Sequence, residues 1–224
     1  MSAPGDRADR AGPLLVACAL RIEQVALRSA GHGRARGTEH ARAGAYTLLR
    51  TGMGPRAAER ALRSALDRPA TERAAVLATG FCAGLVPGMS PGDLVVAEET
   101  RDPRGTVPCT GTALLAEALA RAVPGRTVHT GPLTGSDHVV RGQERAQLRA
   151  TGAVAVDMES AATLWAAVRG GARPVAAVRV IVDAPEHELV RIGTVRGGIS
   201  AFRVLRAVLP AFYEWHRSSL LPRR

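Results

Sequence analysis

The sequence predicts an α/β protein in which helices cover both faces of a sheet. Short apolar runs alternate along the chain with longer segments rich in Ala, Arg and Leu. Several of the short runs are apolar throughout, as strands that are covered on both faces tend to be. An alternation of this kind is typical of a layered α/β domain.

Seven strands and six helices are expected, in alternation. Pro55 suits the first position of a helix, and Pro91 suits a turn. Residues 31–43 and 99–111 are rich in Gly, Arg and Thr and are predicted to be loops. We expect residues 1–12 to form a flexible N-terminal tail and residues 13–224 to form one domain. The expected strands are 14–19, 45–51, 75–80, 93–97, 127–135, 153–156 and 175–182, and the expected helices are 23–29, 55–66, 112–122, 142–151, 159–168 and 198–217.

The last expected helix carries an apolar face and should bend at Pro210. Such a face either packs into the core or meets a partner subunit, a membrane or an apolar substrate. Core packing is the simpler interpretation. The residues of this face are Ile199, Phe202, Leu205, Leu209, Phe212 and Trp215.

Composition argues against several classes of function. The formal charge is +10, but the chain has no Lys, and its arginines are scattered rather than gathered in a block. With 3% aromatic residues there is little to stack on bases, so no nucleic-acid partner is expected. Three widely spaced cysteines fit a reducing cytoplasm, and no apolar run is long enough to span a bilayer. The spacing of His and Cys predicts neither a metal site nor a cofactor.

Acidic residues follow several of the predicted strands. Asp183, Asp157 and Glu159 come directly after strands, and Glu23 lies just past the first one. Ligands of layered α/β domains bind at the carboxyl ends of the strands, so one shared cleft is expected. Taken alone, Asp157 is better explained as a capping group at a helix N-terminus.

Six short motifs occur in one order along nearly the whole chain. Together they resemble the 5′-methylthioadenosine/S-adenosylhomocysteine nucleosidase branch of the nucleoside phosphorylase superfamily. The resemblance implies a single-domain, three-layer phosphorylase-like fold with a mixed, twisted central sheet. The motifs are residues 17–23 (ACALRIE), 51–54 (TGMG), 79–85 (TGFCAGL), 92–96 (GDLVV), 156–160 (VDMES) and 178–183 (VRVIVD).

The resemblance also implies a chemistry, the cleavage of a purine–ribose bond through a sugar cation. Asp183 would protonate the leaving base, Glu23 would orient the attacking water, and Glu159 would hold the ribose hydroxyls, with Met158 packed on the sugar. The implied partners are an adenine nucleoside and a second copy of the chain in a homodimer. The base would lie against Phe81, Cys82, Ala83, Val139 and Val140, and the turn beside the sugar or a phosphate would be Thr51, Gly52 and Gly54.

The sequence departs from the family pattern in ways that make the pocket more apolar. Val182 replaces a Ser that supports the acid, Phe81 replaces a small residue, and Val139 replaces a base-stacking aromatic. With residues 190–199, these departures resemble the hopanoid-associated proteins thought to remove adenine from adenosylhopane. Such a substrate implies peripheral membrane contact. His138 is interpreted as a surface or supporting residue and Cys82 as an apolar wall rather than a nucleophile.

Other functions stay open at this point. Phosphate could replace water if Arg21 or Arg56 bound it. The 5′ group could instead be that of methylthioadenosine, adenosylhomocysteine or futalosine. Outside enzymes, the chain could be a nucleoside-binding module, or a basic scaffold at a membrane surface.

Overall fold

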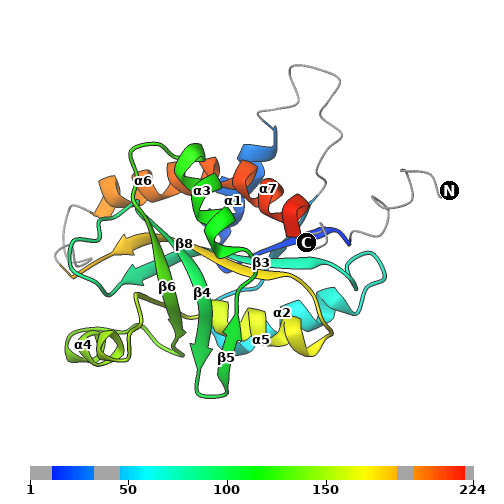
Figure 1. The fold of residues 1–224 in the computed structure, drawn as a ribbon, viewed down its shortest axis with the longest axis horizontal. Coiled ribbons are helices and arrows are strands. Elements are labelled where there is room, and N and C mark those ends of the chain that lie inside the picture. The colour runs from blue at the N-terminus through cyan, green and yellow to red at the C-terminus, as the bar shows by residue number, and fades with distance from the viewer. Residues whose placement is uncertain (1–11, 33–45, 186–193, 220–224) are drawn as a thin grey trace.

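The computed structural model describes residues 12–32, 46–185 and 194–219 (Figure 1). Of the predicted N-terminal tail, only Gly12 lies within the described residues. Every predicted strand and helix has a counterpart there. The strands are β1 (Leu14–Cys18), β2 (Tyr46–Arg50), β3 (Ala75–Gly84), β4 (Leu94–Asp102), β5 (Gly105–Pro108), β6 (Val128–Gly135), β7 (Ala155–Asp157) and β8 (Val175–Asp183). The helices are α1 (Arg21–His32), α2 (Pro55–Leu66), α3 (Thr112–Ala122), α4 (Gln143–Ala150), α5 (Ser160–Arg169), α6 (Thr194–Ala207) and α7 (Leu209–Ser219).

All eight strands form one mixed sheet in the order β2-β1-β3-β7-β6-β4-β5, with β8 bridging β3 and β4. Strand β3 runs parallel to β1 and β8 and antiparallel to β7. Strand β4 runs parallel to β6 and antiparallel to β8. Because β7 also pairs with β6, the pairings β3-β8-β4-β6-β7-β3 close a circuit, so this part of the sheet curls round on itself.

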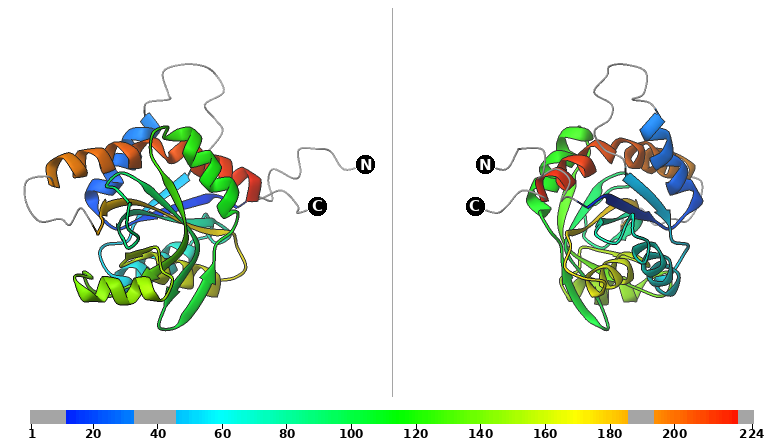
Figure 2. Two further views of the ribbon diagram at one scale, coloured as in Figure 1. Left: turned by 60° about the vertical axis from the view of Figure 1, so that its left-hand side comes forward. Right: turned by 90° about the vertical axis from the view of Figure 1, so that its right-hand side faces the viewer.

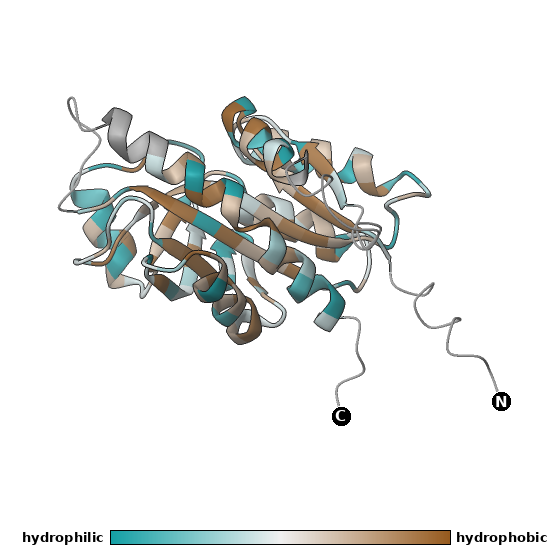
Figure 3. Ribbon diagram, turned by 90° about the horizontal axis from the view of Figure 1, so that it is seen from above, coloured by the Kyte–Doolittle hydropathy of each residue, from teal (hydrophilic) through white to brown (hydrophobic). Residues whose placement is uncertain are grey.

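Helices cover both faces of the sheet, as predicted. Along β1, Leu14, Val16 and Cys18 point into a core shared with α1, α3, α6 and α7. The alternate residues Leu15 and Ala17 point into a second core shared with α2 and α5. Figures 1 and 2 show these two helical layers above and below the strands. In the view from above, the long strands are largely hydrophobic while the helices carry both kinds of residue (Figure 3).

The expected last helix is two helices, α6 and α7, which are separated at Val208. Pro210 is the second residue of α7, where the amide that it lacks would have no helical partner. Leu205, Phe212 and Trp215 are buried in the first core, so this part of the apolar face packs internally. The side chain of Ile199 lies outside the described residues.

The predicted loop at 99–111 is wrong. Strand β4 continues to Asp102 and turns back as β5, with Glu99 opposite Pro108. The turn is stabilised by Asp102, which accepts hydrogen bonds from the backbone and guanidinium of Arg104. Only one side chain of β5, Val107, is buried, so the segment lacks the apolar pattern by which strands are recognised. Among the described residues, no helix combines the length and the apolar character that a membrane crossing requires.

Candidate active site

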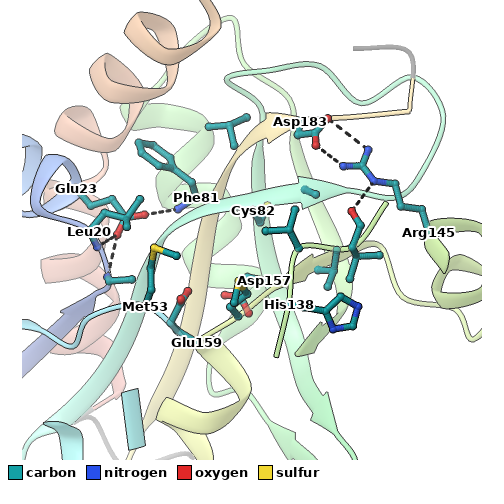
Figure 4. Close-up of a pocket in the computed structure, with 17 residues that line it drawn as sticks. Leu20, Glu23, Met53, Phe81, Cys82, His138, Arg145, Asp157, Glu159 and Asp183 are labelled. Carbon is teal, nitrogen blue, oxygen red and sulfur yellow. Dashed lines mark hydrogen bonds and ion pairs between the residues drawn. The ribbon is translucent and has the colours of Figure 1, made fainter. Parts of the chain in front are cut away.

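A cavity of about 210 Å³ opens where the carboxyl ends of several strands meet. Its walls come from the carboxyl ends of β1, β3, β7 and β8, from the segments that follow β2, β6 and β7, and from α1 and α4 (Figure 4). Within the described part of the chain, no three His, Cys, Asp or Glu side chains are grouped as metal ligands would be. The lining residues are Ala19, Leu20, Glu23, Met53, Phe81, Cys82, Ala83, His138, Val139, Val140, Arg145, Val156, Asp157, Met158, Glu159, Val182 and Asp183.

Glu23 lies in the first turn of α1 and is 2% exposed. Its Oε2 accepts hydrogen bonds from the amides of Ala19 (2.9 Å) and Leu20 (2.8 Å), and its Oε1 accepts one from the amide of Phe81 (2.9 Å). Burial nevertheless raises the pKa of Glu23, against the opposing effects of Arg179 and these three amides. The carboxylate is thus fixed in place and is easier to protonate than an exposed glutamate.

The carboxylate of Glu23 fits there only because residue 80 is glycine. A Cβ at Gly80 would stand 2.5 Å from Oε1 of Glu23 and 2.7 Å from Nη1 of Arg179. The backbone of Gly80 also has φ +136°, which other residues rarely adopt. Gly80 therefore lets β3 pass directly against the buried side chains of Glu23 and Arg179.

Arg179 lies beneath the cavity on β8 and is 1% exposed. Its Nε lies 2.6 Å from Oδ2 of Asp157 and donates to Oγ of Ser160 at 2.8 Å. Its Nη1 donates to the carbonyl oxygen of Thr79 at 3.0 Å, and its Nη2 lies 4.0 Å from Oε2 of Glu159. One guanidinium thus compensates the charge of neighbouring buried carboxylates.

Asp157 and Glu159 both lie just before α5. Both oxygens of Asp157 accept from the amide of Ser160, and Oδ2 also accepts from its hydroxyl at 2.6 Å. The N-cap position of α5 is Glu159, so Asp157, for which the sequence suggested a capping role, satisfies the first amide of the helix from two residues before the cap. Glu159 is 8% exposed, and its Oε1 accepts a hydrogen bond of 2.9 Å from the amide of Gly54. Burial raises the pKa of Glu159, and the nearby Asp157 and Glu23 act in the same direction.

Asp183 ends β8 on the opposite side of the cavity from Glu23 (Figure 4). Its Oδ2 contacts Nη2 of Arg145, and its Oδ1 accepts from Nη1 of the same residue at 3.4 Å. Val182 precedes it, and the side chain of Val182 offers no polar group. Asp183, Glu23 and Glu159 therefore line a single cavity, each held by a different set of donors.

Between these acids the cavity walls are mainly apolar. Phe81, Ala83, Val140 and Met158 line it together with Cys82, and burial keeps the pKa of the Cys82 thiol well above its usual range. A neutral thiol is a poor nucleophile, which supports the interpretation of Cys82 as an apolar wall.

The rim of the cavity is apolar on two sides and polar on a third. Val139 is 59% exposed and Met53 is 63% exposed. His138, also at the rim, lies 2.7 Å from Oδ1 of Asp137 and 3.0 Å from Glu144. It therefore belongs to a surface ion-pair cluster.

The predicted turn at Thr51, Gly52 and Gly54 does not line the cavity, although Met53 within it does. The hydroxyl of Thr51 donates to the carbonyl oxygens of Gly52 (2.9 Å) and Cys18 (3.3 Å). Gly54 reaches the site through its amide, which holds Glu159. The turn thus supports the site indirectly, through its contact with Glu159.

Two charged residues of the site, Arg179 and Arg145, were not predicted from the sequence. Arg179 carries a signal, because it is the one charged residue inside the apolar run of β8 before Asp183. Arg145 carries none, since it is one of two arginines in a polar helix.

Comparisons with known proteins agree with this architecture. A family model described as the phosphorylase superfamily matches residues 14–210. A 5′-methylthioadenosine/S-adenosylhomocysteine nucleosidase from Neisseria meningitidis, in complex with methylthio-immucillin-A, is 20% identical, with a TM-score of 0.69 over 92% of this chain and 99% of that one.

Two further solved structures are similar to the same degree. One is the corresponding nucleosidase from Colwellia psychrerythraea with adenine (18% identity, TM-score 0.70, 92% and 96% covered). The other is an S-adenosylhomocysteine nucleosidase from Streptococcus pyogenes with 5-methylthiotubericidin (20%, 0.71, 91% and 97%). At these identities the likeness concerns the fold. No curated protein sequence matches significantly.

Proposed function

Because this chain belongs to the phosphorylase superfamily, we propose that it is a purine nucleosidase that cleaves the N-glycosidic bond of a 5′-substituted adenine nucleoside. The observation that carries the proposal is the meeting of Asp183, Glu23 and Glu159 in one largely apolar cavity. Cleavage of this bond needs a proton for the leaving base, a nucleophile for the sugar cation and a grip on the sugar. Three separated carboxyl groups can supply these functions.

Asp183 is assigned to the base. It lies at the end of β8, beside the apolar walls formed by Phe81, Cys82, Ala83, Val139 and Val140. A flat heterocycle fits such walls, and a carboxyl group at their edge can give a proton to a ring nitrogen as the bond breaks. A positioned general acid contributes about 10²–10⁴ in rate.

Glu23 is assigned to the water. Its carboxylate is fixed by three amides, so it can orient a water molecule and accept a proton from it with little reorganisation. Burial raises its pKa, which makes the carboxylate a stronger base than an exposed glutamate. Neither Arg21 nor Arg56 lines the cavity, so we favour water over phosphate as the nucleophile.

Glu159 is assigned to the ribose hydroxyls. It lies on the cavity wall, and its neighbour Met158 offers an apolar surface for the sugar ring. The turn at Thr51, Gly52 and Gly54 fixes Glu159 from behind through the amide of Gly54. A carboxylate that accepts two hydroxyl hydrogen bonds would hold the sugar between the acid and the water.

For the 5′ group we propose a large apolar substituent, with adenosylhopane as the substrate and ribosylhopane plus adenine as the products. The exposed side chains of Met53 and Val139 at the cavity rim support this, because they would remain in water beside a small polar substituent. A homodimer with peripheral membrane contact is expected from the resemblance alone, and a cytoplasmic location from the three widely spaced cysteines.

The test is adenine release, measured by chromatography, from adenosylhopane and from 5′-methylthioadenosine, each with and without phosphate. Wild type, Asp183→Asn and the exposed control Asp67→Asn are compared. Phosphate-independent release from adenosylhopane that is lost only in Asp183→Asn supports the proposal. Faster release from methylthioadenosine would replace the substrate, and dependence on phosphate would replace the nucleophile. No release from either nucleoside, with adenine still bound, would favour a nucleoside-binding module.

A further inference from the structure

Helix α4 has one buried residue, and that residue is charged. Arg145 is 8% exposed, whereas Arg149, one turn later, is exposed. Burying a guanidinium is costly unless partners compensate it, so an arginine on the inner face of a polar helix calls for an explanation. The proposed chemistry assigns it no part.

Both sides of the guanidinium are engaged. Nη1 and Nη2 face the two carboxylate oxygens of Asp183, with the longer contact at 3.4 Å, and Nε donates to the carbonyl oxygen of Val140 at 3.3 Å. Figure 4 shows the group reaching from α4 to the end of β8. A fork of this kind fixes the plane of a carboxylate as well as its place.

We propose that Arg145 is a positioning residue that aims the carboxyl group of Asp183 at the base; the inference rests on the proposed function. Asp183 stands at the last position of its strand and is followed by Ala184. The side chain of Val182 beside it carries no hydrogen-bond donor. Arg145 reaches both carboxylate oxygens of Asp183 from the neighbouring helix α4. Its Nε also donates to the carbonyl oxygen of Val140, which lines the proposed base pocket.

The proton balance of the reaction is unchanged by this role. Asp183 gives its proton to the leaving base as the glycosidic bond breaks, and Glu23 takes a proton from the water whose oxygen bonds to the sugar carbon. Solvent then returns a proton to Asp183 and takes one from Glu23. Arg145 keeps its protons throughout, so its effect passes entirely through the geometry and charge of Asp183.

A residue that acts through another should lose its effect when the other is removed. The experiment is a double-mutant cycle of Arg145→Met and Asp183→Asn, with Arg145→Lys as the conservative variant and Arg149→Met as the matched control on the same helix. For each protein, kcat and KM are measured for 5′-methylthioadenosine and adenosylhopane, and the dissociation constant of adenine is measured by calorimetry. Urea unfolding reports the stability of every variant.

We expect Arg145→Met to lower kcat about tenfold to a hundredfold, part of the roughly 10²–10⁴ that a positioned acid contributes, with KM changed less than about threefold. In the Asp183→Asn background the same substitution should change kcat less than about twofold. Arg145→Lys should recover part of the rate, and Arg149→Met should behave as wild type.

Several outcomes would overturn the inference. Equal losses of rate in both backgrounds would mean that Arg145 only anchors α4, and so would losses that follow stability alone. If wild type releases adenine from neither nucleoside, the proposed function fails and the positioning role fails with it. An active wild type with an additive cycle would overturn the role of Arg145 alone.

Discussion

The amide of Gly54 donates a hydrogen bond of 2.9 Å to Oε1 of Glu159, which lies 105 residues further along the chain. This contact joins the turn after β2 to the start of α5. Gly54 has φ +87° and immediately precedes α2, so its amide projects from a tight turn rather than from a helix. Gly54 therefore fixes Oε1 of Glu159, while Oε2 lies 4.0 Å from Nη2 of Arg179.

Replacing Glu159 by Gln should separate the binding of sugar from the binding of base. The amide oxygen of Gln can still accept from Gly54, but the charge that would grip two hydroxyls is lost. We expect KM for the nucleoside to rise about tenfold or more while the dissociation constant of free adenine stays within about twofold of wild type. Steady-state kinetics and calorimetry measure the two quantities. Glu214→Gln, on the surface of α7, is the control. An equal weakening of both ligands would contradict the assignment.

Gly80→Ala should inactivate the protein through a collision with Glu23. The added Cβ would stand 2.5 Å from Oε1 of Glu23, so the carboxylate or the strand must shift. We expect adenine release to fall at least about a hundredfold, because a displacement of about 1 Å at a catalytic group can cost that much.

The control for Gly80 is another glycine with a positive φ. Gly125 has φ +83° and no heavy atom within 4 Å of an added Cβ. Gly125→Ala should therefore lose about 1–2 kcal/mol of unfolding free energy from backbone strain while activity persists. If both variants lose activity alike, strain rather than crowding of Glu23 explains the effect.

Activity should decline on acidification before the fold does. Burial raises the pKa of Glu23, and Glu23 must be ionised to accept a proton from water. The acidic limb of kcat/KM should therefore lie above the ordinary glutamate value of about 4.3. Because burial raises the pKa of Glu159 as well, both groups favour the folded protein when protonated. That contribution is present below their unfolded pKa values and is lost as pH rises through the folded ones.

Acidification from about pH 7 to about pH 5 should therefore not unfold the protein through these two groups. Measuring kcat/KM and circular dichroism across this range in the same buffers tests both statements. A rate profile that is flat down to the ordinary glutamate range would exclude Glu23 as the base. Simultaneous loss of rate and dichroism would instead attribute the decline to unfolding.

Most of the fold could be predicted because its strands and helices carry strong local patterns. The apolar run of β1 and that of β8, which only Arg179 interrupts before Asp183, indicate strands covered on both faces, and α2 begins at Pro55 as expected. Strand β5 was not predicted, because only Val107 of its residues is buried and because its pairing with β4 depends on tertiary structure. The closure of the sheet through β8 is equally beyond a local pattern.

The residues of the candidate site likewise fall into those that the sequence predicts and those that it does not. Asp183, Glu159 and Glu23 could be found because they follow strands, and strand ends meet. Arg145 could not, since nothing in an Arg-rich sequence distinguishes a buried arginine from a solvated one. Thr51 was expected in the cavity, but its hydroxyl turns to backbone carbonyls and only the neighbouring Met53 lines the wall.

The rim of the cavity should decide between large and small 5′ groups. Met53 is 63% exposed although it lines the cavity, and burial of apolar surface stabilises a complex by roughly 25 cal/mol per Å². A large apolar substituent would cover this side chain, whereas a methylthio group is too short to cover much of it. Met53→Ser should therefore raise KM for adenosylhopane about tenfold and leave KM for methylthioadenosine within about twofold.

Ile22→Ser is the matched control, because Ile22 is 52% exposed on α1 and does not line the cavity. It should leave both KM values unchanged. If Ile22→Ser and Met53→Ser weaken adenosylhopane equally, the apolar surface acts through a general attraction to lipid rather than through the cavity. If Met53→Ser weakens methylthioadenosine as much as adenosylhopane, Met53 contacts the sugar, and the size of the 5′ group must be read from another wall.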